Sequence, residues 1–424
     1  LFDDLVWRGL VHDVTDPALG DLLGAGPLTA YHGIEPTADS LAVHHLLGII
    51  GMIRLQQAGH RVLALVGGGT AMVGDPSGSS GERSLLDLEE VKANVEGVRS
   101  QMERLLEQAG GPTPVRVIDN SEWLWPLGLM EFLRDIGKHF TVNAMLAKES
   151  VRARLEEREQ GISFTEFSYM LLQAYDFLHL FDTHGCRLQL GGSDQWGNIV
   201  MGADLVRRVR GEQVFGLTTP LLVDEHGGKL GKTEAGAVWL DAARTSPYRL
   251  YQYLLNTADT QVGTLLRAFT LLPRERIEGL DAATAEHPER REGQRALAQA
   301  VVSLVHGAAE AERAAHAGAV LFSEDIAGLD EATLLDVVAE APVTTMPRSS
   351  LADAGLSLID ALQATEMTPS KSAARRAIDQ GGAYVNNRRI ADVDQALTVA
   401  DLLHDRYVIL RKGKRDHHLL RFEA

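Results

Sequence analysis

Residues 31–40 read Tyr31-His32-Gly33-Ile34-Glu35-Pro36-Thr37-Ala38-Asp39-Ser40. This stretch predicts a strand that breaks at Pro36 and leads into a helix capped near Asp39 or Ser40. A second segment, Lys229-Leu230-Gly231-Lys232-Thr233, predicts a glycine-bearing loop with two lysines three residues apart. A helix N-terminus offers unpaired N–H groups and positive dipole charge, and lysines add point charges. Together the two segments predict a clamp on a triphosphate.

Short apolar runs alternate with helical stretches from Leu28 to Val223. The predicted helices are Leu41–Ala58 and Leu85–Gln108, and the predicted strands are Leu28–Ile34, Arg61–Val66, Val115–Ile118, Arg187–Leu190 and Leu217–Val223. This alternation indicates an α/β fold with a parallel sheet covered on both faces and ligands at the carboxyl ends of its strands. Glycine clusters at Gly67–Gly69, Gly74–Gly78 and Gly191–Gly192 fall at these ends, although each alone is also compatible with a simple turn.

The sequence predicts three domains and one linker. A sheet-bearing domain covers 1–246 and contains a strand-free helical insertion at about 125–185. Residues 247–325 are alanine-rich and helical, and we expect them to form a separate domain. A linker is expected over 326–350, where Ala341–Ser350 contains two prolines, and a small α+β unit over 351–424.

Composition limits the class of protein. The 424 residues are 45% hydrophobic and 23% charged, which is typical of a soluble protein. No apolar run approaches the roughly 18 residues that a membrane helix needs, and Leu1–Leu10 lacks the basic-then-apolar order of a signal peptide. Cys186 is the single cysteine, so an internal disulfide is excluded and a reducing cytoplasm is expected.

The charge is distributed unevenly. The whole chain has a formal charge of −17, whereas residues 366–424 hold 11 Lys and Arg against 8 Asp and Glu. Within this end, Pro369–Ile378 predicts a capped helix with basic residues on one face, and Gly381–Asn386 predicts a turn into a strand. A mildly basic end on an acidic chain suits contact with RNA, although an ordinary solvated surface has the same composition.

One predicted helix carries polar residues at helical spacing. Tyr169, Gln173 and Asp176 stand at positions i, i+4 and i+7, which places them on one helix face among Phe, Met and Leu. This pattern predicts a pocket for a small polar ligand. A buried tyrosine beside two solvated residues would show the same spacing.

Several motifs together resemble the bacterial tyrosyl-tRNA synthetases, which are class I aminoacyl-tRNA synthetases, and they follow that family's order over nearly the whole chain. Beside the two segments above, the matching stretches are Trp7–Leu10, Pro36–Leu41, Leu65–Gly68, Gly74–Gly78, Phe132–Phe140, Ile162–Met170 and Gly191–Asn198. The resemblance implies a Rossmann-like catalytic domain, an α-helical domain that contacts tRNA and a small C-terminal RNA-binding domain. It also implies a homodimer formed through the helical insertion.

The family's activity implies a tyrosine—tRNA ligase. Such an enzyme joins L-tyrosine to ATP as tyrosyl-adenylate, releases pyrophosphate, and passes tyrosine to the 3′ end of tRNA(Tyr). ATP is then a substrate accompanied by Mg²⁺, and we expect no metal site made of protein side chains.

The resemblance also assigns residues. The implied catalytic residues are Thr37, His45, Lys229, Lys232 and Thr233. The implied tyrosine ligands are Tyr31, Asp75, Asn120, Tyr169, Gln173, Asp176 and Gln195, and the implied ATP ligands are His32, Gly33, Gln189, Asp194 and Lys232. Candidate phosphate contacts for RNA are Lys371, Arg375, Arg376, Arg388, Arg411, Lys412, Lys414 and Arg415.

The family's His-x-Gly-His signature is altered here to Ala42-Val43-His44-His45. On a regular helix positions 42 and 45 share a face and position 44 points about 200° away from 42, so His44 is not expected to replace the histidine missing at 42. Losing one charge-stabilising donor typically costs ~10²–10³ in rate. His32 and Glu35, where the family often has Cys and Asp, are milder departures that we also place at the nucleotide end.

These departures leave three hypotheses open. The first is a tyrosine—tRNA ligase whose nucleotide site is slow or resistant to an adenylate-like inhibitor. The second is a tyrosine-adenylating duplicate that serves another acceptor. The third is a non-catalytic RNA-binding relative.

Overall fold

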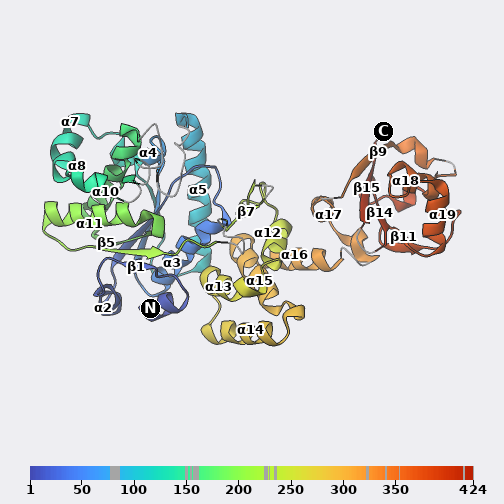
Figure 1. Ribbon diagram of the computed structural model, residues 1–424, viewed down its shortest axis with the longest axis horizontal. Helices are drawn as coiled ribbons and strands as arrows, with labels where there is room; N and C mark the ends of the chain where they lie inside the picture. The colour runs from blue at the N-terminus through green and yellow to red at the C-terminus, as the bar shows by residue number, and fades with distance from the viewer. Residues whose placement is uncertain are drawn as a thin grey trace. The chain divides into compact units, whose positions relative to one another are not determined.

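The structure is a computed structural model, and it describes residues 1–76, 86–148, 151–152, 155, 162–223, 228, 230–233, 236–320, 324–339, 341–352, 354–413 and 416–423. The chain divides into two compact units (Figure 1). The first comprises Leu1–Thr245 and Leu254–Val305, and the second comprises Ser246–Tyr253 and His306–Ala424. In the described part of the chain, no helix combines the length and the apolar character that crossing a membrane requires.

A six-stranded sheet with the order β1-β6-β5-β2-β3-β4 forms the centre of the first unit. Its strands are β1 (Asp13–Val14), β2 (Thr29–Ile34), β3 (Arg61–Val66), β4 (Arg116–Asp119), β5 (Cys186–Gly192) and β6 (Phe215–Thr219). All neighbours are parallel except β1, which pairs antiparallel with β6. The predicted parallel sheet is confirmed. The last strand lies earlier than the predicted Leu217–Val223, and the two-residue β1 is too short to give a sequence signal.

Helix α10 (Phe164–His184) packs on one face of this sheet. Tyr31 of β2 and its neighbour Leu63 of β3 belong to the same core cluster as residues of this helix. The Tyr31 ring meets the Phe177 ring edge-on, with centroids 5.4 Å apart. The helix begins where Ser163 Oγ accepts a hydrogen bond from the Glu166 N–H and ends at Gly185, whose φ is +60°. These caps set the register of the helix, which carries three of the expected site residues.

The remaining helices of the first unit connect or cover the strands. Helix α3 (Leu46–Gln57) joins β2 to β3, and α5 (Leu88–Ala109) joins β3 to β4 (Figure 1). Shorter or later elements are α1 (Phe2–Trp7), α2 (Leu19–Ala25), η1 (Val43–His45), α4 (Gly68–Ala71), α6 (Ser121–Leu124), α7 (Leu129–Glu131), η2 (Phe132–Ile136), η3 (Gly137–His139), α8 (Val142–Leu146), η4 (Ser193–Gln195), α11 (Trp196–Arg210), β7 (Lys232–Thr233), β8 (Gly236–Ala237), α13 (Asp259–Phe269), α14 (Arg274–Glu286), η5 (Pro288–Arg290) and α15 (Glu292–His306).

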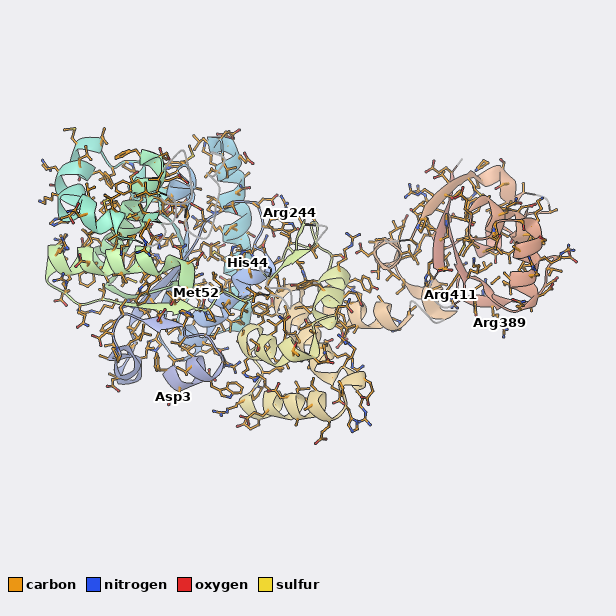
Figure 2. All side chains as sticks on the ribbon, viewed as in Figure 1. Asp3, His44, Met52, Arg244, Arg389 and Arg411 are labelled. Atoms are coloured by element: carbon orange, nitrogen blue, oxygen red, sulfur yellow. The ribbon has the colours of Figure 1, made fainter. Side chains whose placement is uncertain are left out.

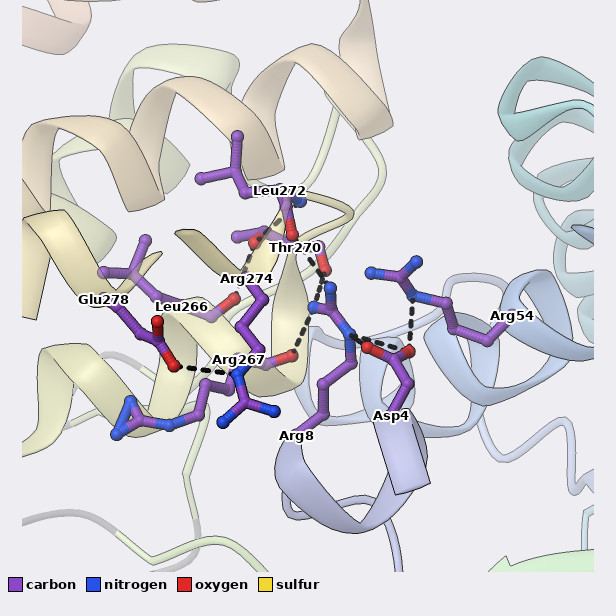
Figure 3. A network of polar contacts seen from close by, with 9 residues as sticks. All are labelled: Asp4, Arg8, Arg54, Leu266, Arg267, Thr270, Leu272, Arg274 and Glu278. Carbon is purple, nitrogen blue, oxygen red and sulfur yellow. Dashed lines mark hydrogen bonds and ion pairs between the residues drawn. The ribbon is translucent and has the colours of Figure 1, made fainter. Parts of the chain in front are cut away.

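A buried arginine ties the helices after residue 254 to the start of the chain (Figure 3). Arg8 is 2% exposed, and its guanidinium donates to the carbonyl oxygens of Thr270 (3.0 Å) and Leu272 (2.8 Å) beyond α13. Its Nε donates to Asp4 at 3.1 Å, and Asp4 also pairs with Arg54 of α3 at 3.7 Å. These contacts explain why 254–305 fold with the first unit, whereas the sequence predicts one separate helical domain over 247–325.

The second unit contains α12 (Pro247–Leu255) up to Tyr253 and, after α15, α16 (Ala308–Val320), η6 (Glu324–Gly328) and a five-stranded sheet with the order β12-β11-β14-β15-β9. The other elements are α17 (Glu331–Val337), β9 (Val343–Pro347), η7 (Arg348–Leu351), β10 (Leu356–Ser357), α18 (Leu358–Ala364), α19 (Lys371–Asp379), β11 (Ala383–Val385), β12 (Arg388–Ile390), β13 (Ala396–Leu397), η8 (Val399–Asp401), β14 (Tyr407–Lys412) and β15 (Asp416–Glu423).

The segment expected as a linker, 326–350, is structured where it is described. It contains α17 and the edge strand β9, which runs parallel to β15. The prolines that suggest a linker flank this strand, and Pro347 occupies its last position. An edge strand tolerates proline there, because no ladder hydrogen bond is lost in the sheet interior.

Candidate active site

A cavity of about 470 Å³ opens at the carboxyl ends of the central strands β2 and β5. This is where the strand alternation predicts a ligand, because the order of the sheet reverses direction between these two neighbours. Residues from both strands, from α10 and from the turn before α3 line it. The cavity therefore brings together segments that are more than 200 residues apart in the chain.

The buried end of the cavity carries polar groups that suit one ligand hydroxyl group. The Tyr31 hydroxyl is buried and has no hydrogen-bond partner among the described residues. Asp176 of α10 lines the same cavity; its Oδ2 accepts from Asn120 Nδ2 at 3.0 Å and its Oδ1 accepts from Trp123 Nε1 at 2.7 Å. Burial raises the pKa of Asp176 to about 7, although these two donors act in the opposite direction. A hydroxyl group of a ligand would supply the hydrogen-bond partner that the Tyr31 hydroxyl lacks.

Trp123 is a site residue that the sequence analysis misses. Its indole N–H fixes one oxygen of Asp176, and its ring stacks on His179 with centroids 4.5 Å apart. The sequence does carry a signal for Trp123. It stands three residues after the expected ligand Asn120, and this spacing places both side chains on the same side of the short helical turn after β4.

Polar groups at the other side of the cavity match the expected ammonium ligands. Gln195 Nε2 donates to Asp75 Oδ2 at 2.7 Å, and Asn198 Nδ2 donates to Gln173 Oε1 at 2.9 Å. Tyr169, Gln173 and Asp176 all reach the cavity from α10, as their spacing predicts. The carboxylate and amide oxygens here suit a ligand ammonium group.

Glu35 belongs to this ammonium side, and its expected place at the nucleotide end is wrong. Its carboxylate accepts from the Asp75 backbone N–H at 3.0 Å and from the Tyr169 hydroxyl at 3.3 Å. Burial raises the pKa of Tyr169 well above its ordinary value, and Glu35 and Asp75 raise it further. Tyr169 is therefore a neutral hydroxyl donor, and the longer Glu35 side chain reaches two ammonium-side residues.

The signature turn differs from the expected regular helix. Ala42 is extended (φ −100°, ψ 164°), and the 3₁₀ turn η1 precedes α3. The chain stays extended because Leu240 N–H donates to Leu41 O at 2.8 Å and Val43 N–H donates to Val238 O at 2.9 Å. The predicted helix start near Asp39 or Ser40 is therefore wrong.

His44 faces the same cavity as His45, which corrects the helical-wheel expectation. Both histidines line the cavity, and their ring centroids are 4.1 Å apart (Figure 2 labels His44). Positions 42 and 44 are separated by about 200° only on a regular helix, whereas Ala42 is extended. His45 Nδ1 accepts from the Ala42 N–H at 2.9 Å, so Nε2 holds the ring proton of a neutral His45. Burial lowers the pKa of His45 well below its ordinary value, and His44 and His32 lower it further.

The lysine segment touches this turn through its glycine. Gly231 has a φ of +85°, and a Cβ on it would stand 2.5 Å from Val43 Cγ1. The lysine segment thus meets the turn that follows residues 31–40, nearly 190 residues away in the chain. Lys229 lies outside the described residues, and for Lys232 and Thr233 the described structure covers the backbone of β7 and not the side chains.

The other expected catalytic and nucleotide ligands, which are Thr37, His32, Gly33, Gln189 and Asp194, all line the cavity. His32 Nδ1 donates to the Leu190 carbonyl at 3.1 Å, and burial lowers the pKa of this ring. The Gln189 Oε1 atom is buried without a partner in the described part of the chain. Within those same residues, no group of three or more His, Cys, Asp and Glu is arranged to hold a metal ion.

The expected RNA contacts in the second unit fall into two groups. Arg375, Arg376 and Arg388 are exposed, as is Lys371, which pairs with Asp360 at 2.7 Å. Lys414 and Arg415 lie outside the described residues.

Arg411 and Lys412 make internal contacts instead of presenting free cations. The Arg411 guanidinium lies 3.6 Å from the centroid of the Tyr384 ring, and its Nε donates to Asn387 Oδ1 at 3.2 Å. Arg411 is only 9% exposed, and Lys412 Nζ donates to the Met367 carbonyl. The prediction that Arg411 contacts phosphate is wrong because its position on β14 faces inward.

Two family models match the chain. Residues 24–323 match the class I tRNA synthetases for Trp and Tyr, and residues 338–420 match the C-terminal domain of tyrosine—tRNA ligases of the SYY type. The chain is 50% identical to the tyrosine—tRNA ligase of Roseiflexus castenholzii over 421 residues, covering 99% of each protein. It is 46% identical to that of Geobacillus stearothermophilus over 425 residues, covering 100% of this chain and 99% of the relative.

Solved structures agree with these matches. The fold is similar to a C-terminally truncated mitochondrial tyrosyl-tRNA synthetase from Aspergillus nidulans, with a TM-score of 0.68 and 33% identity over 76% of this chain and 93% of that one. The archaeal enzyme from Archaeoglobus fulgidus, solved with L-tyrosine, is 18% identical with a TM-score of 0.55 and shows the shared fold. Cavity, sequence relatives and fold agree, and the chain belongs to the tyrosyl-tRNA synthetase family of class I aminoacyl-tRNA synthetases.

Proposed function

We propose that this chain is a tyrosine—tRNA ligase, which forms tyrosyl-adenylate from L-tyrosine and ATP and then transfers tyrosine to the 3′ end of tRNA(Tyr). The observation that carries the proposal is that the unpartnered Tyr31 hydroxyl and the Asp176 carboxylate line the same cavity. The hydroxyl group of a phenol can accept a hydrogen bond from the Tyr31 hydroxyl and donate one to the Asp176 carboxylate. The same two groups would stay unpaired beside a phenylalanine ring.

This pairing supplies the amino-acid specificity. A site built to hydrogen-bond a hydroxyl rejects the analogue that lacks it, because its own buried polar groups are then unsatisfied. The discrimination of about 10⁵ against phenylalanine is the reference value for tyrosyl-tRNA synthetases themselves. Asn120 and Trp123 hold the Asp176 carboxylate in place for this contact. Asp75, Tyr169 and Gln173 then take the ammonium group of the substrate.

The activation step needs few reacting protein groups. A carboxylate oxygen of tyrosine attacks the α-phosphorus of ATP, and the bond to the bridging oxygen breaks as pyrophosphate leaves with its electron pair. Thr37 and the Nε2–H of His45 donate to the leaving phosphates, and Lys229 and Lys232 neutralise their charge. Mg²⁺ accompanies the nucleotide through its phosphate oxygens. Asp194 holds the ribose, and His32, Gly33 and Gln189 complete the nucleotide end.

We further propose that the protein is a homodimer. Large apolar side chains are exposed on the helical insertion, among them Leu129 (70%), Met130 (75%), Val142 (59%) and Phe164 (78%). Exposed apolar side chains concentrated in one segment are typical of a protein–protein interface. A Met130→Glu variant should shift the protein towards the monomer in light scattering, whereas Val399→Glu, at an exposed apolar position of the second unit (51%), should not.

tRNA is the proposed partner of the helical region and of the second unit. The exposed cations of α19 and the β11–β12 turn, which are Lys371, Arg375, Arg376 and Arg388, are proposed phosphate contacts, together with Lys414 and Arg415. The proposed organisation is a catalytic unit that contains the parallel sheet, helices that contact tRNA, and a C-terminal RNA-binding domain.

The test is tyrosine-dependent exchange of labelled pyrophosphate into ATP with Mg²⁺, followed by charging of tRNA(Tyr). The proposal expects both activities, and it expects Asp176→Asn to lose selectivity against phenylalanine. Exchange without charging would indicate a tyrosine-adenylating enzyme with another acceptor. Absence of exchange with intact tRNA binding would indicate a non-catalytic RNA-binding relative and overturn the proposal.

A further inference from the structure

The Ala42 side chain does not line the cavity, whereas the His44 side chain does. Ala42 is 2% exposed, does not line the cavity, and forms a β-bridge with Trp239. Its extended backbone and its hydrogen bond to His45 Nδ1 hold it there. His44, two residues later, is solvent-exposed and lines the cavity beside His45. The altered signature therefore still brings two imidazole rings to the cavity.

His44 also lies beside the segment that carries the lysines. A Cβ built on Gly231 would stand 3.7 Å from the His44 backbone nitrogen and 2.5 Å from Val43. Gly231 stands between Lys229 and Lys232 in the sequence, and the Val238 N–H donates to the Gly231 carbonyl at 2.8 Å. The Val43 N–H in turn donates to Val238 O, so the turn and the lysine segment are held together. Position 44 is therefore at the phosphate side of the nucleotide end.

We propose that His44 is a catalytic residue of this chain, whose imidazole N–H donates to the β- or γ-phosphate of ATP as charge builds up on the leaving pyrophosphate. The inference rests on the proposed function and adds a residue to the same step. No bond to His44 forms or breaks, because the ring stabilises the pyrophosphate oxygens while the electron pair of the breaking P–O bond moves onto them. Two adjacent rings with centroids 4.1 Å apart can donate to neighbouring phosphate oxygens.

The first experiment compares variants at position 44 in pre-steady-state formation of tyrosyl-adenylate. His44→Gly and His44→Phe should both slow the step by at least tenfold, within the ~10²–10³ typical for one lost donor, and leave the Kd for tyrosine unchanged. His44→Gln, which retains a side-chain N–H, should recover part of the rate. His287→Asn is the matched control. His287 is also an exposed histidine, but it stands at the C-terminal end of α14 and does not line the cavity.

The phenylalanine variant separates charge stabilisation from stacking. A His44→Phe protein with the full activation rate would mean that position 44 contacts the adenine ring, and would overturn the proposal. The reverse reaction gives a second measurement: the Kd of pyrophosphate for the enzyme–adenylate complex should rise in His44→Gly. An unchanged pyrophosphate affinity and an unchanged rate in that variant would also refute it.

Restoring the family's signature provides a third test. The Ala42→His, His44→Gly double variant should be no faster than the unaltered protein, because it removes the donor at position 44 in exchange for one at position 42. A rate above that of the unaltered protein would overturn the inference. If the unaltered protein shows no exchange, the proposed function fails separately, and calorimetric binding of Mg²⁺–pyrophosphate still tests His44. Weaker binding by His44→Phe would then support its phosphate contact, and equal binding would refute it.

Discussion

Replacing Gly48 with alanine is expected to destabilise the first unit through a clash with His32. A Cβ on Gly48 would stand 2.2 Å from His32 Nε2, 2.7 Å from Cε1 and 2.8 Å from Cδ2. The ring cannot move away freely, because its Nδ1 donates to the Leu190 carbonyl at 3.1 Å. The family's common Cys at position 32 is smaller, so the histidine in this chain depends on the glycine at 48.

The magnitude follows from three opposing effects. Overpacking of a buried site costs roughly 1–3 kcal/mol, and loss of the hydrogen bond to Leu190 costs about 0.5–1.5 kcal/mol. Replacing glycine by alanine in a helix interior recovers about 1 kcal/mol. The expected net loss in the free energy of unfolding is therefore roughly 0.5–3.5 kcal/mol.

The assay is urea unfolding followed by tryptophan fluorescence. All five tryptophans, Trp7, Trp123, Trp125, Trp196 and Trp239, belong to the first unit, so the signal reports on that unit. Gly51→Ala, one turn later on α3, is the matched control. Its Cβ would lie 3.6 Å from the nearest Leu190 atom, an ordinary contact, so this change should stabilise by up to about 1 kcal/mol.

A double-mutant cycle isolates the pair. In a His32→Ala background the Gly48→Ala change should become neutral or stabilising, because the ring is gone. If Gly48→Ala is as stable as the unaltered protein, or if its cost persists without His32, the steric reasoning is wrong.

The remaining predictions concern the hydroxyl end and the second unit. Burial raises the pKa of Asp176 to about 7, so the folded protein keeps a proton on this carboxyl that the unfolded chain releases near the ordinary pKa of 3.8. The resulting stabilisation of the folded state is complete below pH 3.8 and is lost as the pH rises through 7. Urea unfolding should therefore show a fall of order 2–4 kcal/mol over this range that is absent in Asp176→Asn, and an equal pH profile in both proteins would contradict the buried proton. Trp123→Phe removes a donor to the carboxylate and should raise the Kd for tyrosine about tenfold or more by equilibrium dialysis, while an unchanged Kd would show that Asn120 suffices. Arg411→Met should lower the free energy of unfolding of the second unit by about 1–3 kcal/mol in a thermal melt. Arg375→Met should leave this stability unchanged but weaken tRNA binding and reduce its salt dependence. Weaker tRNA binding and unchanged stability in Arg411→Met would show that Arg411 faces RNA.

Local patterns in the sequence were sufficient for the features that depend on neighbouring residues. The strands around Tyr31 and Leu63 follow from their apolar runs, and the common face of Tyr169, Gln173 and Asp176 follows from the 3.6-residue period of α10. The family follows from motifs in their order. These features need no information about distant parts of the chain.

Tertiary pairing decided the features that the sequence analysis predicted wrongly or missed. The chain is extended at Ala42 because residues 238–240, almost 200 positions away, pair with it, and this pairing turns His44 into the cavity. Glu35 reaches the ammonium side only because Asp75 and Tyr169 fold next to it.

The same distinction holds for Trp123, for Arg411 and for the helices after residue 254. The amino-acid sequence by itself determined the family and the parallel sheet, and the family resemblance pointed to Tyr31 and Asp176 as candidate ligands for a hydroxyl group. Only the tertiary structure decided that Trp123 supports Asp176, that Arg411 stacks on Tyr384 inside the second unit, and that Arg8 fixes the later helices to the first unit. The physical reason is that a local pattern specifies which side of an element a residue occupies, whereas the partner it meets there is set by chain segments that are distant in sequence.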